Sequence, residues 1–152
     1  MANLNLICGV PASGKDTYLN TYHKDDYIVS RDNIRYSFLK DGEDYFAHEN
    51  EVYRKFVETI NYYGAIGDKD VWANQTNLNY LSRVKLLNNV QLSFFDKVNA
   101  YYILCNYETA SKRNSLRKGR LRVPEKTLQN MFMSFAVPTI EEGFDGVFQI
   151  IT

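Results

Sequence analysis

The residues best suited to bind an anion lie between Gly9 and Thr17, in the segment GVPASGKDT. Gly9 to Lys15 fits the pattern GxxxxGK, follows an apolar run and precedes a probable helix. Glycines let backbone N–H groups turn inward around phosphate oxygens, and a lysine at this place reaches the β- and γ-phosphates. The pattern predicts an ATP site made by Gly9, Ala12, Ser13, Gly14, Lys15, Asp16 and Thr17.

Asp16 occupies the position where this loop usually has a serine or threonine hydroxyl that holds Mg²⁺. A carboxylate beside a triphosphate is repelled unless a cation lies between them. One hypothesis therefore places Asp16 on the magnesium, directly or through water. The alternative is a solvated residue of the first helical turn, favoured by the helix dipole.

A second group of charged residues, SRDNIR, ends a short apolar run at residues 30–35. Asp32 is expected near the γ-phosphate, where a carboxylate can accept the proton of an attacking hydroxyl. Arg35 is one helical turn away and can orient that carboxylate or hold an acceptor phosphate. The alternative is an Asp32 that caps the helix and a solvated Arg35.

The segment between Glu108 and Glu125 has no acidic residue and carries six basic ones: Lys112, Arg113, Arg117, Lys118, Arg120 and Arg122. With Gly119 near its centre, it is a candidate lid at about 112–124 that closes over the phosphates. A solvated basic surface helix is the alternative.

The elements that position these residues follow from hydrophobic spacing. Runs typical of strands occur at 4–8, 27–30, 70–74, 98–105 and 146–151, and helical spacing at 49–66, 80–95 and 124–135. This alternation predicts an α/β fold of three layers, α/β/α, with a mostly parallel five-stranded sheet. Active sites of such folds lie at the carboxyl ends of the strands, where the segments above begin.

Bulk properties are those of one domain spanning 1–152. The net charge is +0, so any contact with nucleic acid must come from a local patch. Cys8 and Cys105 lie in apolar runs and indicate a reduced compartment. Without a signal peptide or an apolar stretch long enough for a membrane, a cytoplasmic protein is expected. The sequence leaves open whether the protein is a homo-oligomer.

The motifs GVPASGKDT, SRDNIR, QTNLN, KRNSLRKGRLRVPEKTL and EGFDGVFQI occur in that order over nearly the whole chain. Together they resemble the kinase domain of bacteriophage polynucleotide kinase. The resemblance implies an adenylate-kinase-like P-loop fold with a helical lid, and ATP and Mg²⁺ as cofactors. It also implies a DNA or RNA partner whose 5′-hydroxyl end receives the γ-phosphate.

The same resemblance implies roles for single residues. Lys15 would bind phosphate, Asp32 would be the general base, Arg35 its companion, and Arg117 the lid arginine on the transferring phosphate. Arg113 and Arg120 are further candidates for nucleotide contacts. This chain departs from the family in having Asp16 in place of serine, and Gln75 in place of an acidic residue; the two changes are hypothesised to compensate around one metal.

Two other functions stay open. A kinase of a small molecule would have a closed, mostly apolar acceptor pocket, whereas a polynucleotide kinase needs a basic, partly aromatic channel, for which Arg35, Tyr36 and Phe38 are candidate walls. The third possibility is a nucleotide-binding module without catalysis, for which Asp16 and Gln75 are the best support.

Overall fold

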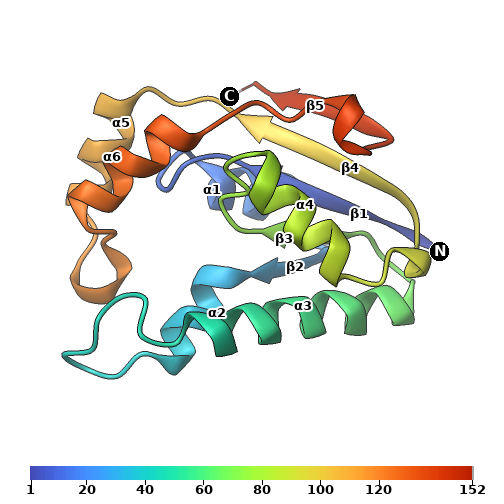
Figure 1. Cartoon of the computed structure of the whole chain (residues 1–152), viewed down its shortest axis with the longest axis horizontal. Helices are drawn as coiled ribbons and strands as arrows, with labels where there is room; N and C mark the ends of the chain where they lie inside the picture. The colour runs from blue at the N-terminus through green and yellow to red at the C-terminus, as the bar shows by residue number, and fades with distance from the viewer. Residues whose placement is uncertain (152) are drawn as a thin grey trace.

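The computed structural model describes residues 1–151, with the exception of the side chain of Arg120. Its centre is a five-stranded sheet in the order β2-β3-β1-β4-β5 (Figure 1). The strands are β1 Ala2–Cys8, β2 Tyr27–Ser30, β3 Val71–Asn74, β4 Phe95–Ile103 and β5 Gly146–Ile150. Every neighbouring pair is parallel, which confirms the predicted α/β sheet.

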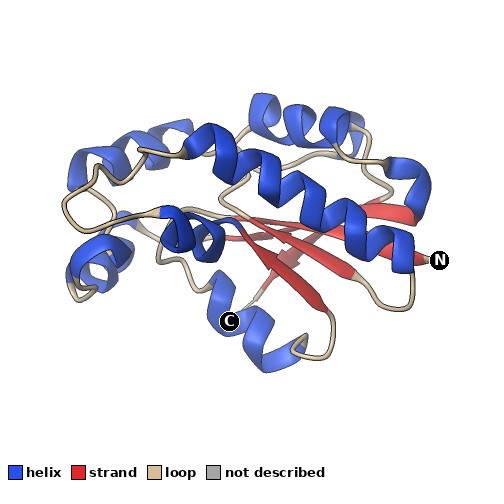
Figure 2. Cartoon of the chain, turned by 90° about the horizontal axis from the view of Figure 1, so that it is seen from below, coloured by secondary structure: helices blue, strands red, loops and turns tan. Residues whose placement is uncertain are grey.

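The described residues also form six α-helices: α1 Lys15–Tyr22, α2 Arg31–Phe38, α3 Glu49–Ile66, α4 Tyr80–Asn89, α5 Tyr107–Ser115 and α6 Glu125–Ser134. Side chains of a strand alternate between faces, so Leu6 and Ile7 point in opposite directions. Leu6 packs in the same cluster as residues of α3 and α4, whereas Ile7 packs with Leu19 of α1. Helices thus lie on both sides of the sheet, which gives three layers (Figure 2).

Local sequence explains where most helices begin and end. On α3, Val52, Phe56 and Ile60 form a fully buried stripe, and Gly67 ends the helix with a left-handed φ of 72°. The start of α4 is a capping box, in which Asn79 and Ser82 exchange side-chain-to-backbone hydrogen bonds. The bounds of α3 confirm the helix predicted at 49–66.

The helix predicted at 80–95 is too long, because α4 ends at Asn89. Val90 is extended, with ψ of 157°, and the N–H of Gln91 donates to the Asn61 side chain at 2.8 Å instead of continuing the helix. A short 3₁₀ turn then leads to Phe95, which is buried as the first residue of β4. The strand expected to begin at 98 therefore begins earlier, since long-range pairing with β1 overrides the helical spacing.

Both cysteines in the described part of the chain are free thiols. Cys8 is buried in β1, and this burial raises its pKa to about 12. None of the helices among residues 1–151 combines the length and hydropathy that a membrane crossing requires.

A buried ion pair joins α4 to the C-terminal part of the chain. The guanidinium of Arg83, which is 1% exposed, donates to both carboxylate oxygens of Glu142 at 2.7 and 3.0 Å. Its remaining nitrogen donates to the carbonyls of Asn77 and Ala136, each at 2.9 Å. One arginine thus holds the loop after β3 and the segment after α6 in place.

We expect Arg83→Ala to lower the free energy of unfolding by about 3–5 kcal/mol, because it leaves the buried Glu142 carboxylate without a counter-charge. Chemical denaturation measures the difference. Arg54→Ala is the matched control, since Arg54 is exposed on α3; it should change stability by less than about 0.5 kcal/mol. Equal effects of the two substitutions would contradict this assignment.

Candidate active site

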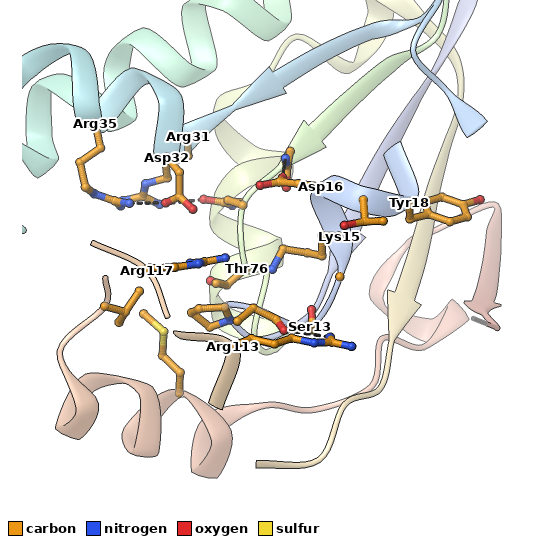
Figure 3. Close-up of a pocket in the computed structure, with 18 of the residues that line it drawn as sticks. Ser13, Lys15, Asp16, Tyr18, Arg31, Asp32, Arg35, Thr76, Arg113 and Arg117 are labelled. Carbon is orange, nitrogen blue, oxygen red and sulfur yellow. Dashed lines mark hydrogen bonds and ion pairs between the residues drawn. The ribbon is translucent and has the colours of Figure 1, made fainter. Parts of the chain in front are cut away.

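A cleft of ≈ 680 Å³ opens at the carboxyl ends of the strands, as expected for this sheet. Its walls include residues 11–18 after β1, the start of α2 after β2, residues 74–76 at the end of β3, and two arginines of the basic segment, Arg113 on α5 and Arg117 after it. Figure 3 shows Lys15, Asp16, Asp32 and Arg117 around the same space. The charged residues selected from the sequence are therefore brought together.

The loop from Gly9 to Gly14 has the backbone that an anion cradle needs. Ala12 and Gly14 have positive φ values of 63° and 105°, which turn the chain into the start of α1. Gly9 lies behind the loop: its N–H donates to the Thr76 carbonyl, and a Cβ there would come within 2.7 Å of Ile103. Gly9 therefore shapes the loop. The first residues of α1, whose N–H groups lack partners within the helix, line the cleft.

Lys15 and Ser13 are the polar side chains of this loop. The Lys15 ammonium donates to the carbonyls of Gly9 and Val10, both at 2.9 Å. Burial lowers the pKa of Lys15, although the negative charges of Asp32 and Asp16 oppose that shift. The Ser13 hydroxyl is buried without a hydrogen-bond partner among the described residues. Lys15 therefore has one further donor for an oxyanion in the cleft, while the Ser13 hydroxyl is packed close to Gly9.

On the opposite wall, Asp32 lies in the first turn of α2. Ser30 caps this helix by accepting the N–H of Asn33 at 3.2 Å, so the alternative of an N-capping Asp32 is wrong. One Asp32 oxygen accepts from Arg35 Nη1 at 2.5 Å, and the side chain is 46% exposed to the cleft. The predicted pairing of these two residues on one helix face is confirmed.

Arg35 is buried rather than solvated, and a residue that the sequence analysis did not select holds it there. Glu49, the first residue of α3, accepts from Arg35 Nε and Nη2 at 2.7 Å each, and from Arg31 at 3.1 Å. Burial alone would lower the pKa of Arg35, but its hydrogen bonds to Glu49 raise it. A buried arginine requires a carboxylate partner, but spacing along the chain does not reveal which one.

Aromatic residues close the far end of the cleft, but not those expected. Tyr45 and Phe46, from the loop before α3, line the cleft, and the Arg35 guanidinium lies 4.8 Å from the centre of the Tyr45 ring. Tyr36 and Phe38 are not among the described lining residues. Tyr36 is half-buried near Asp32 and Tyr45, and burial and the charge of Asp32 raise its pKa.

The basic segment contacts the phosphate loop, which is far away in the sequence. Arg113 Nη1 donates to the Ala12 carbonyl at 3.2 Å, and Arg117 lines the cleft. Buried Asn114 fixes the return of the segment by exchanging two hydrogen bonds with the backbone of Val123. These contacts set the segment apart from a merely solvated surface helix. The predicted nucleotide contact of Arg120 lies outside the described residues, because the structure does not describe this side chain.

Asp16 and Thr17 are exposed on the first turn of α1 and line the cleft. Asp16 Oδ1 accepts from Asn74 Nδ2 at 2.7 Å, at the end of β3. Gln75 turns to the other side, where it accepts from Arg31 at 2.7 Å and donates to Asn77 at 2.7 Å. Across residues 1–151, no three His, Cys, Asp or Glu side chains gather as a ready metal site.

We expect Glu49→Gln to lower the free energy of unfolding at neutral pH by about 1.5–3 kcal/mol, the range for hydrogen bonds to charged groups. Burial opposes the shift, but the bonds from Arg35 and Arg31 lower the pKa of Glu49 below its ordinary 4.5. The stabilisation is therefore complete above pH 4.5 and is lost as the pH falls through the depressed value. Denaturation from pH 3 to 8 should show the difference from the parent shrinking only at the acid end. The same difference at every pH would contradict it, and Glu58→Gln on the exposed side of α3 is the control.

Comparison with solved structures finds chains of the same fold. A sugar kinase from Janibacter sp. superposes with a TM-score of 0.66 at 16% identity, over 98% of this chain and 86% of that one. A gluconokinase from Sinorhizobium meliloti superposes with a TM-score of 0.62 at 12% identity, over 99% of this chain and 83% of that one. A fungal RNA kinase superposes with a TM-score of 0.64 at 12% identity. The superposition covers 99% of this chain but only 38% of the fungal protein.

Sequence comparison gives the family. No curated protein matches the chain. A family model described as an AAA domain matches residues 4–138. The resemblance to bacteriophage polynucleotide kinases in particular stays a prediction. Because the match spans most of the chain, the protein belongs to this AAA domain family, and its fold is that of a P-loop kinase.

Proposed function

We propose that the protein is an ATP-dependent phosphotransferase that moves the γ-phosphate to the 5′-hydroxyl of a polynucleotide. The observation that carries the transferase part is the single cleft with the phosphate loop on one wall and Asp32 on the other. In phosphoryl transfer the protein mainly positions the reactants and stabilises charge. A loop that holds the donor opposite an exposed carboxylate provides the positioning.

The chain's own residues supply the chemical roles. Lys15 and the N–H groups at the start of α1 hold the phosphates. Asp32 accepts the proton of the attacking hydroxyl, while Arg35 fixes the orientation of that carboxylate. Arg117 faces the space between Asp32 and Lys15, where charge develops on the transferring group (Figure 3). Bound Mg²⁺ would neutralise phosphate charge, and the cleft offers Asp16 and Asn74 as oxygen ligands for it.

The polynucleotide part is supported by what lies beyond Tyr45. A second hollow of ≈ 700 Å³ lies between the loop before α3 and residues 118–122 of the basic segment. Tyr45 lines both this hollow and the cleft. The charged residues of the hollow are Lys40, Asp41, Glu43, Lys118 and Arg122. Glu43 is already engaged by His48 and by the Lys40 N–H, so its charge is the less available one. With three basic residues against two acidic ones, next to the shared Tyr45 ring, the hollow offers stacking and phosphate contacts to a single strand.

A small-molecule acceptor is the second candidate, favoured by the similarity in fold to a sugar kinase and a gluconokinase. The deciding experiment is transfer from labelled ATP to a 5′-hydroxyl oligonucleotide, run beside nucleosides, sugars and gluconate. Labelled oligonucleotide supports the proposal. Transfer to a small acceptor alone would reject the polynucleotide part, and transfer to none would reject the enzyme.

Asp32→Asn should lower kcat by roughly 10²–10⁴-fold, the usual effect of losing a general base. The affinity for ATP should change little, because Asp32 lies opposite the phosphate loop. Steady-state kinetics with the active acceptor measure both constants. Asp25→Asn, an exposed aspartate after α1, is the control, and a near-normal kcat for Asp32→Asn would remove Asp32 from the mechanism.

The double variant Lys118→Ala/Arg122→Ala should weaken the binding of oligonucleotides but not that of small acceptors. Each basic residue that contacts a phosphate of a single strand adds about 0.7 to the slope of log affinity against log salt. Losing two should lower that slope by about 1.4 and leave a single nucleoside acceptor unaffected. Lys55→Ala/Lys97→Ala removes two exposed lysines elsewhere as the charge-matched control. Equal weakening by both double variants would show that the hollow does not bind the acceptor.

A further inference from the structure

Among the acidic side chains of the cleft, Asp16 differs from the others in its partners. The described lining includes five basic side chains, Lys15, Arg31, Arg35, Arg113 and Arg117, and three acidic ones, Asp16, Asp32 and Glu49. Asp32 is bound by Arg35, and Glu49 by Arg35 and Arg31. Asp16 has no basic partner among the described side chains, since its hydrogen bond comes from the neutral amide of Asn74.

The neighbouring lysine attracts Asp16 but forms no ion pair with it. Lys15 is adjacent in sequence, yet its ammonium donates to the carbonyls of Gly9 and Val10. Asp16 therefore presents an unpaired negative charge at the mouth of the phosphate loop, beside the end of β3. Without a cation, that charge repels a bound triphosphate.

A second unsatisfied group in this loop is Ser13. The residue is 4% exposed and lines the same cleft, and its hydroxyl, which lies close to Gly9, has no hydrogen-bond partner among the described residues. A buried hydroxyl without a partner is costly unless a ligand completes it. The loop is thus built for an anion next to a carboxylate that needs a cation.

We infer that Asp16 is a direct carboxylate ligand of the nucleotide's Mg²⁺, oriented by Asn74, and that it makes triphosphate binding strictly dependent on the metal. This rests on the proposed function, because it takes the loop to bind a nucleoside triphosphate. Carboxylate oxygens are preferred Mg²⁺ ligands, and Mg²⁺ is held by one or two of them together with phosphates and water. The usual hydroxyl is neutral, so it coordinates the metal without repelling the metal-free nucleotide.

Substituting Asp16 should change the affinity for metal-free nucleotide and the gain in affinity with Mg²⁺ in opposite directions. Asp16→Asn removes the charge but keeps the Oδ1 oxygen that accepts from Asn74. Metal-free nucleotide should bind several-fold more tightly to this variant than to the parent, while the gain on adding Mg²⁺ should fall by roughly tenfold, within the ordinary range of coupling between two ligands. Asp16→Ser should lose the repulsion as well and keep more of the gain, since it restores a hydroxyl ligand.

The experiment is calorimetric titration of the full chain with a non-hydrolysable ATP analogue, once in EDTA and once in excess Mg²⁺. Asp25→Asn is the control, because it removes one exposed aspartate outside the cleft and should leave both affinities unchanged. Unfolding curves establish that each variant is folded.

The result expected is a smaller Mg²⁺-dependent gain for Asp16→Asn, together with tighter binding in EDTA. A gain within about twofold of the parent's would overturn the inference and leave the proposed function standing. Weaker binding in EDTA would also overturn it, since Asp16 would then attract rather than repel the nucleotide. If the parent binds no nucleotide with or without metal, both the proposed function and the inference fail.

Discussion

The insertion of β3 between β1 and β2 is the constraint on which the site depends. Parallel pairing puts Ile7, Asn74 and Ser30 in one row across the three strands. Neighbouring strands are about 4.8 Å apart, so the ends of β1 and β2 are held about 10 Å from each other. The phosphate loop follows the one and Asp32 the other, with the end of β3 as the floor between them. The spacing of a parallel sheet therefore sets the width of the cleft before any side chain contributes.

The second feature is the uneven distribution of charge in that cleft. Arg31, Arg35 and Glu49 form a network in which every described carboxylate oxygen of Glu49 is used by a guanidinium. Such a network is a poor source of stability, because desolvation offsets much of the attraction. Its effect is to fix Arg35, and through it Asp32, in one orientation. Arg113 and Arg117 of the basic segment, by contrast, line the cleft without a carboxylate partner among the described residues, so their charges are available for an anionic ligand.

The two departures from the family motif lie on different sides of β3. Asp16 is bonded to Asn74 on the side of the phosphate loop, whereas Gln75 completes the Arg31 network on the side of α2. An amide suits the latter place, because it accepts from Arg31 and donates to Asn77 at once, which a carboxylate does not do. The carboxylate of this region is therefore found on α1 rather than on β3. This arrangement fits the hypothesis of compensating changes, which remains a prediction.

The sequence by itself determined the elements whose patterns are local. The strands, the 49–66 helix, the phosphate loop and the Asp32–Arg35 pair all depend on residues close together in the chain, where periodicity and motif spacing are informative. The partners that complete the site are long-range: Glu49 for Arg35, Asn74 for Asp16, and Ala12 for Arg113, which is 101 residues away. The same limit explains why the helix predicted at 80–95 is longer than α4, since pairing with β1 decides where β4 begins. Only the tertiary structure chose Tyr45 and Phe46 over Tyr36 and Phe38 as cleft walls, because a loop's path over its neighbours leaves no periodic trace in sequence.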